Sequence, residues 1–327
     1  MCIRFTRLEY PTSWQRSDPH KLMNSQLKPD QLAILEDTAY QIRRFVVEMI
    51  CYSQWGHIGG SLSLADILSV LYFQAMVIDP IHPKMDSRDR LILSKAHSSP
   101  ALYAALALRG FFPVEKLYTY CELDGMLEGH TDMKRTPGLE SSGGPLGMGL
   151  SVAVGIGLGL KMKENPQSRV FCILGDGEVN EGNIWEAAMA AAHYHLDNLI
   201  AVMDYNKVMA KGMVSDLMGI EPLAAKWSAF GWEVMEVDGH DLQSLATAFY
   251  QARWIKPHGK PIMIIAHTVK GRGVEFAEFN YKWHTHAPDP QTADLMLRAL
   301  AHRYTKPEEG YSLIDQPVKK ETFYGGE

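Results

Sequence analysis

The segment from residue 170 to residue 206 most constrains the fold of this chain. An apolar run, 170–174, ends in Gly-Asp-Gly at 175–177, and a helix-forming stretch follows. A second apolar run, 199–203, ends in Asp-Tyr-Asn at 204–206. Two apolar runs joined by a helix predict a βαβ unit with parallel strands. An oxygen-bearing side chain would then lie just past the carboxyl end of each strand.

Asp176 and Asn206 are candidate ligands of a metal ion that holds a diphosphate. Hard divalent cations such as Mg²⁺ bind carboxylate and amide oxygens and complete their coordination with phosphate and water. The glycines on either side of Asp176 let a bulky phosphate approach the backbone. Gly-Asp-Gly alone is also a common turn, but the flanking strand, helix and second strand favour the metal–diphosphate interpretation.

The rest of the chain predicts an α/β fold with a central, mainly parallel sheet and helices on both faces. Further strands are expected at 90–94, 232–237 and 261–267. Helices are expected from Pro29 to before Gly56 and over 64–76, 100–108, 150–161, 181–195, 222–230 and 242–255. Ser61 or Ser63 is the expected cap of the second helix, and 150–161 is expected to be buried.

One domain, 29–305, is expected, preceded by an arm over 1–28 and followed by a polar tail over 306–327. Ligands of such folds bind beyond the carboxyl ends of the strands. Asp176, Asn206, the segment 95–97 and the segment 270–273 all follow expected strands, so we expect them to converge on one crevice.

Composition excludes several classes of function. The net charge of −6 gives no basic surface for nucleic acid. The four cysteines have no C-x-x-C spacing, which argues against zinc and favours free thiols in a reducing compartment. The first residues lack the apolar region of a signal peptide, and the longest uncharged apolar run, near 150–160, is too short to span a bilayer. We therefore expect a cytoplasmic location and no membrane.

Three histidines, His57, His97 and His130, each lie in a Gly- or Ser-rich loop. Each alone is more often an ordinary loop residue, but together they suit donation to phosphate or sugar oxygens and proton transfer near neutral pH. The glycine-rich segment 143–147 is either a tight turn or a platform for a flat ring. Glu178 and Glu181 could simply complement a helix dipole. His284 and His286 alone supply too few ligands for a metal site.

In order along the chain, these motifs resemble the N-terminal, diphosphate-binding half of transketolase, and more closely the separate N-terminal subunit of two-chain transketolases. The resemblance covers about residues 30–300. The matching segments are 56–60, 93–97, 128–130, 144–147, 175–178, 204–206, 221–223 and 270–273. An ordered set of this kind is far more specific than Gly-Asp-Gly alone.

The resemblance implies thiamine diphosphate with Mg²⁺ or Ca²⁺. The implied metal ligands are Asp176, Asn206 and the carbonyl of Val208. The implied cofactor contacts are His97, Gly144, Pro145, Leu146, Gly175, Asp176, Gly177, Glu178, Asn206 and His284. His284 is favoured over His286 because it directly follows Trp283. His57, His97 and His130 would assist proton transfers of a sugar, and Glu181 would join a carboxylate network between paired sites.

The implied reaction is transfer of a two-carbon ketol unit between sugars or sugar phosphates. The resemblance assigns the glutamate that activates the cofactor, and most sugar-phosphate ligands, to a pyrimidine-binding domain on a separate partner chain, in an (αβ)₂ assembly. The alternatives are a subunit of another thiamine diphosphate enzyme, similar to deoxyxylulose-phosphate synthase or a 2-oxoacid dehydrogenase, and a noncatalytic cofactor-binding scaffold. Met148 and the segment 209–211 depart from the family pattern on the expected substrate side, and the sugar itself is not specified.

Overall fold

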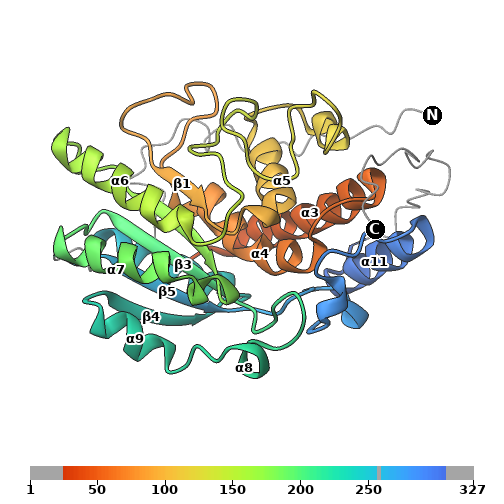
Figure 1. Cartoon of the computed structure of the whole chain (residues 1–327). Coiled ribbons are helices and arrows are strands. Elements are labelled where there is room, and N and C mark those ends of the chain that lie inside the picture. Colours follow the sequence, from red (N-terminus) through yellow and green to blue (C-terminus); the bar gives the residue numbers. More distant parts are fainter. Residues whose placement is uncertain (1–24, 256–258, 307–327) are drawn as a thin grey trace.

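The computed structural model describes residues 25–255 and 259–306, and a five-stranded parallel sheet lies at its centre (Figure 1). The strand order is β1-β2-β3-β5-β4, and every neighbouring pair is parallel. The strands are β1 (Arg90–Leu93), β2 (Val170–Gly175), β3 (Leu199–Tyr205), β4 (Glu233–Asp238) and β5 (Ile262–His267). The predicted parallel α/β sheet is therefore confirmed, with each strand within two residues of its expected bounds.

Helices cover both faces of the sheet, as predicted (Figure 1). One face packs against α3 (Pro29–Ser53), α4 (Ile58–Val70), α5 (Ser99–Arg109), α10 (Leu242–Tyr250) and α11 (Pro290–Arg303). The other packs against α6 (Met148–Met162), α7 (Gly182–His193) and α9 (Leu223–Ala229). A single-turn helix, α8 (Val214–Leu217), follows β3. The three central strands β2, β3 and β5 are almost wholly buried, because parallel strands with helices on both faces have no solvent side.

Helix α4 begins at Ile58, three or more residues before the serine caps expected from the sequence. Gly59 and Gly60 would favour a loop in isolation, but tertiary packing keeps them helical. A β-carbon on Gly59 would lie 2.8 Å from the Trp283 carbonyl oxygen, so only glycine lets the first turn run this close to residue 283. A short π-helix, Leu71–Ala75, follows α4 directly.

The stretch Ile58–Ala75 is long and apolar enough by composition to cross a membrane, but all of it is buried inside the fold. Core helices of this kind pass the same compositional test.

The expectation that α6 is a buried helix is wrong for one of its faces. Leu150, Ala153, Val154, Gly157 and Leu160 face the core. On the opposite side, Met148 is 51% exposed and Met162 is 84% exposed. An apolar helix sequence does not distinguish burial within its own chain from burial against another chain.

The N-terminal arm and the C-terminal tail expected from the sequence lie mostly outside the described residues. Within the described part, the chain from Ser25 to Lys28 runs along α10, where Gln243 accepts from the Leu27 amide and donates to the Ser25 carbonyl. After α11, Lys306 forms an ion pair with Asp37 of α3.

Candidate active site

The carboxyl ends of the strands bring the predicted metal ligands to one edge of the sheet. In the register of the sheet, Gly175 pairs with Asp204, and Asp204 pairs with Ala266. Asp176, Asn206 and Thr268 therefore lie at the ends of three adjacent strands, within one residue of the same level. This juxtaposition is the one expected from the βαβ interpretation of the sequence.

Asp176, Asn206 and Val208 form a buried group of oxygen atoms. The Asp176 carboxylate accepts from the Gly177 amide at 2.7 Å and from the Lys207 amide. Burial and the nearby Asp204 carboxylate raise the pKa of Asp176 to about 6. The Asn206 side chain donates to Asp204 at 3.2 Å, while its oxygen accepts from the Val208 amide at 3.2 Å. A cation beside Asp176 would relieve the cost of burying this carboxylate.

A cationic side chain already contacts this group. The Lys270 ammonium donates to the Val208 carbonyl at 2.8 Å and to the Met209 carbonyl at 3.2 Å. Burial lowers the pKa of Lys270 to about 8, against the opposing effect of Asp176. The oxygens present therefore fit a positive ion. In the described part of the chain no three His, Cys, Asp or Glu side chains gather as a metal site, so any metal here depends on amide and carbonyl oxygens in addition to the Asp176 carboxylate.

Asp204 and Lys95 form a buried pair next to the candidate metal ligands. The sequence reasoning did not single out this pair. Asp204 is wholly buried and accepts from Lys95, from Thr268 and, at 2.7 Å, from Ser63. These donors lower the pKa of Asp204 against the effect of burial. Because Asp204 also accepts from the Asn206 amide nitrogen, it turns the Asn206 oxygen away from itself and fixes the orientation of that candidate ligand.

The imidazoles of His57, His97, His130 and His284 gather in one cluster. His57 is central: its ring centroid lies 5.0 Å from His97, 5.3 Å from His284 and 6.1 Å from His130. Trp55 stacks edge-on against both His57 and His130. Nδ1 of His57 is buried and has no hydrogen-bond partner among the described residues. His286 is exposed and packs on Trp283 instead, at 5.0 Å.

All four clustered histidines are held neutral near pH 7. Burial lowers the pKa of His57 to about 4, with further contributions from His130 and Lys270. Burial and the neighbouring Lys270 lower the pKa of His284 to about 3. Burial also lowers the pKa of His97 and of His130. A neutral imidazole carries one donor and one acceptor nitrogen, which suits proton exchange with hydroxyl groups.

The segment 143–147 forms a tight, partly exposed loop beside this cluster. A β-carbon on Gly143 would lie 2.6 Å from that of Ala96, whereas one on Gly144 would meet nothing within 4 Å. Pro145 and Leu146 are exposed. The loop therefore packs closely through Gly143 and presents 144–146 outward.

Glu178 joins three loops of the site. Its carboxylate accepts from the Gly147 amide at 2.8 Å, from the Gly175 amide at 2.9 Å and from the Ser94 hydroxyl. Burial raises the pKa of Glu178 despite these donors. Both of its oxygens are thus engaged within the chain.

Glu181 is the residue just before α7, where it is exposed. A β-carbon on Gly147 would lie 2.8 Å from that of Glu181, so the glutamate borders the outward loop.

Comparisons with known proteins agree with this geometry. A family model described as "Transketolase, thiamine diphosphate binding domain" matches residues 34–311. The chain is 47% identical to the 6-deoxy-6-sulfo-D-fructose transketolase subunit of Clostridium sp. (strain MSTE9), over 76% of this chain and 90% of that subunit. It is 37% identical to one subunit of the apulose-4-phosphate transketolase of Phocaeicola vulgatus, over 85% of this chain and 98% of that relative.

The fold is similar to that of solved transketolases. A transketolase from Pichia stipitis in complex with sedoheptulose-7-phosphate superposes with a TM-score of 0.78 at 29% identity. The match covers 84% of this chain but 41% of that one, so the chain corresponds to less than half of the longer enzyme. The predicted thiamine diphosphate-binding fold is confirmed. The chain belongs to the transketolase family, as a counterpart of the N-terminal, thiamine diphosphate-binding subunit of its two-subunit members.

Proposed function

We propose that this chain transfers a two-carbon ketol unit from a ketose to an aldose, together with a separate subunit that carries the pyrimidine-binding domain and the activating glutamate. The observation that carries the proposal is the placement of four neutral imidazoles beside the oxygens of Asp176, Asn206 and Val208. The oxygens suit a metal ion that holds a diphosphate, and the imidazoles suit a substrate with several hydroxyl groups.

In this proposal Asp176, Asn206 and the Val208 carbonyl hold Mg²⁺ or Ca²⁺. The Gly177 amide, His97 and His284 bind the diphosphate, and Gly144 to Leu146 line the thiazolium ring. When bound, thiamine diphosphate supplies the carbanion chemistry that cleaves and forms the carbon–carbon bonds. Lys270, which is hydrogen-bonded to the Val208 carbonyl, would add positive charge beside the anionic diphosphate.

The protein's own contribution is to position and to exchange protons. His57, His97 and His130 are neutral and their rings lie close together, so each can accept a proton from a sugar hydroxyl or return one. Trp55 holds two of these rings edge-on. A β-carbon on Gly129 would lie 2.4 Å from the Trp55 ring, so the glycine before His130 makes room for that contact.

The exposed elements of this site support an arrangement completed by other chains. Leu146, Met148 and Val152 of the outward loop and α6 are exposed apolar side chains, and Met189 of α7 adds to them. Contiguous exposed apolar side chains typically mark interaction surfaces. Glu181 borders the same region. We infer an (αβ)₂ assembly in which the partner chain and a second copy of this chain cover these elements.

In this proposal the donor is a ketose, and the partner subunit supplies most of the contacts to the group at the far end of the sugar from the carbonyl. The relatives named above act on a sulfonated fructose and on apulose 4-phosphate, by their names. The greater identity to the sulfofructose relative makes 6-deoxy-6-sulfofructose the first donor to test, with xylulose 5-phosphate and fructose 6-phosphate as the ordinary phosphorylated comparisons.

The test is to co-express the chain with a candidate pyrimidine-binding subunit encoded beside it and to measure ketol transfer over this donor panel. We expect activity only from the complex, with thiamine diphosphate and Mg²⁺ added. The variant Asp176→Asn should assemble but lose cofactor affinity, whereas the exposed Asp216→Asn should behave like the wild type. Full ketol transfer by the isolated chain would refute the two-chain proposal. Cofactor binding without turnover on any donor would favour a scaffold, and pyruvate decarboxylation would favour a different thiamine diphosphate enzyme.

A further inference from the structure

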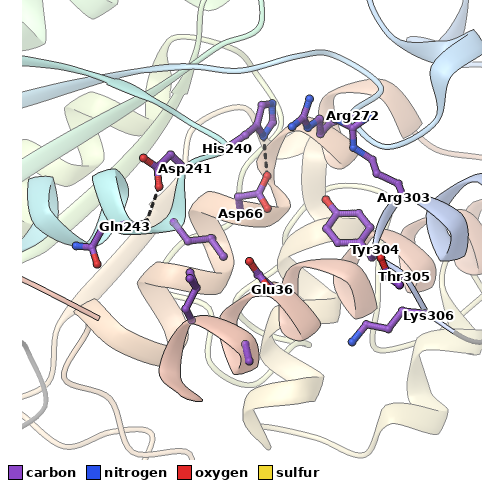
Figure 2. A pocket seen from close by; sticks show the side chains of 13 residues that line it. Glu36, Asp66, His240, Asp241, Gln243, Arg272, Arg303, Tyr304, Thr305 and Lys306 are labelled. Atoms are coloured by element: carbon purple, nitrogen blue, oxygen red, sulfur yellow. Dashed lines mark hydrogen bonds and ion pairs between the residues drawn. The ribbon is translucent and has the colours of Figure 1, made fainter. Parts of the chain in front are cut away.

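A polar cavity of about 500 Å³ lies away from the candidate active site, between α3, the start of α10, the loop after β5 and the end of α11. Figure 2 shows the side chains that line it, and none of the candidate active-site residues is among them. Its size is within the range of small-molecule sites. The basic residues that line it are Arg272, Arg303, Lys306 and His240.

Arg272 is the unusual member of this lining. It is half-buried, and its Nε is buried without a hydrogen-bond partner in the part of the chain that the structure describes. Burial lowers the pKa of Arg272, and the Arg303 guanidinium lowers it further. In Figure 2 the two guanidinium groups lie at the same end of the cavity. Two cations this close repel each other unless an anion lies between them.

The acidic groups near Arg272, of which Asp66 partly offsets the lowering of its pKa, form no ion pair with it among the described residues. The Asp66 carboxylate is hydrogen-bonded to the Arg43 guanidinium, at 3.0 Å, and to Nδ1 of His240, at 2.6 Å. Asp241 caps α10 by accepting from the Gln243 amide at 3.0 Å. Glu278 lies 3.4 Å from Arg303 and accepts from the Gly273 amide, but forms no ion pair with Arg272 among the described residues.

We propose that this cavity binds a phosphorylated polyol, with its phosphate between Arg272 and Arg303. Guanidinium groups donate two parallel hydrogen bonds to phosphate oxygens, which suits a pair of arginines at one end of a cavity. The other walls carry acceptors for hydroxyl groups, namely the exposed Glu36 and the Asp241 carboxylate. The site is additional to the proposed ketol transfer and does not depend on it.

The cavity shares a loop with the candidate active site. Nε2 of His240 accepts from the Val269 amide at 2.8 Å, and Arg272 follows Lys270 by two residues. Because phosphates could also bind at the diphosphate site, the test must separate the two locations.

The experiment titrates the full chain with glycerol 3-phosphate by calorimetry, with glycerol as the uncharged comparison. Glycerol 3-phosphate has no carbonyl group and is therefore no ketol donor. We expect saturable binding with one site per chain and none for glycerol. Arg272→Gln should weaken binding about tenfold or more, since charged hydrogen bonds are lost. Arg303→Gln should weaken it less, because Glu278 already shares that guanidinium.

Two controls keep the result interpretable. Arg298→Gln removes the same charge from an exposed position of α11 outside the cavity, and Asp176→Asn alters only the diphosphate site; both should bind as the wild type does. Since the Arg272 side chain has no hydrogen-bond partner among the described residues, Arg272→Gln should keep the wild-type melting temperature. Equal affinity in Arg272→Gln and wild type, equal weakening by Arg298→Gln, or the absence of saturable binding would overturn the proposal.

Discussion

The ammonium group of Lys270 lies 2.7 Å from Nδ1 of His284. An ammonium group can only donate, so Nδ1 accepts and the proton of this neutral imidazole is on Nε2. The same lysine lowers the pKa of His284, after burial, and so holds the ring in its neutral form. His284 thus carries an N–H donor within the histidine cluster, where its neighbouring rings are those of His57 and His97.

This tautomer predicts that His284, and not His286, supports cofactor binding. We expect His284→Ala to weaken thiamine diphosphate binding about tenfold or more, because a donor to a charged phosphate is lost. His286→Ala is the matched control. Because the His286 side chain is exposed and packs on Trp283, this variant should bind thiamine diphosphate with the affinity of the wild type. Calorimetric titration with thiamine diphosphate and Mg²⁺ measures both. A larger loss in His286→Ala would reverse the assignment.

The buried Lys95–Asp204 pair predicts a large stability effect. Both side chains are almost fully buried, at 2% and 0% exposed. Lys95→Met would leave the Asp204 charge buried without its cation, which should lower the free energy of unfolding by about 3–5 kcal/mol. Urea unfolding of the cofactor-free chain measures this.

The exposed pair Lys161–Asp197 serves as the comparison for that experiment, since its side chains are 37% and 31% exposed. Lys161→Met should cost about 1 kcal/mol or less. Similar losses in the two variants would mean that the buried pair is not an essential part of the fold.

The sequence predicted most of the sheet well because β1, β2, β3 and β5 each contain an apolar run that ends at a glycine or a polar residue. Topology alone then placed Asp176 and Asn206 at one edge. The Lys95–Asp204 pair could not be found this way. Its members are 109 residues apart in the sequence. Lys95 follows β1 and Asp204 lies near the end of β3, and these strands are not neighbours, since β2 lies between them. Strand order is a tertiary property that no local pattern carries.

Two further features of the structure also depend on tertiary contacts that the sequence alone does not show. The gathering of His284 with His57 came from the family resemblance and not from any spacing in the sequence, because loops from opposite ends of the chain meet there. The exposed face of α6 was missed because its composition is that of a core helix. In both cases the neighbour of a residue, and not the residue itself, decides its role.

We expect the hydrogen bonds of Glu178 to hold the exposed loop 143–147 in place. All three groups around its carboxylate are donors, from Ser94, Gly147 and Gly175. Glu178→Gln would place an amide N–H₂ against one of them, so we expect a loss of about 1–3 kcal/mol in stability. Amide hydrogen exchange in 143–149 should quicken. Glu186→Gln, on the exposed side of α7, should change neither quantity. Unaltered exchange in Glu178→Gln would contradict this role.

His57 predicts a specific dependence of stability on pH. Its pKa is about 4 in the folded chain, chiefly through burial, and about 6.5 in the unfolded chain. Between these values the unfolded chain binds more protons, so the stability contributed by neutral His57 is fully present above about pH 6.5 and is lost as the pH falls toward 4. In His57→Gln the side chain stays neutral throughout. The urea midpoint of the cofactor-free wild type should therefore fall more between pH 7 and pH 5 than that of His57→Gln. Parallel pH profiles would mean that the His57 imidazole is protonated in the folded chain as readily as in the unfolded one.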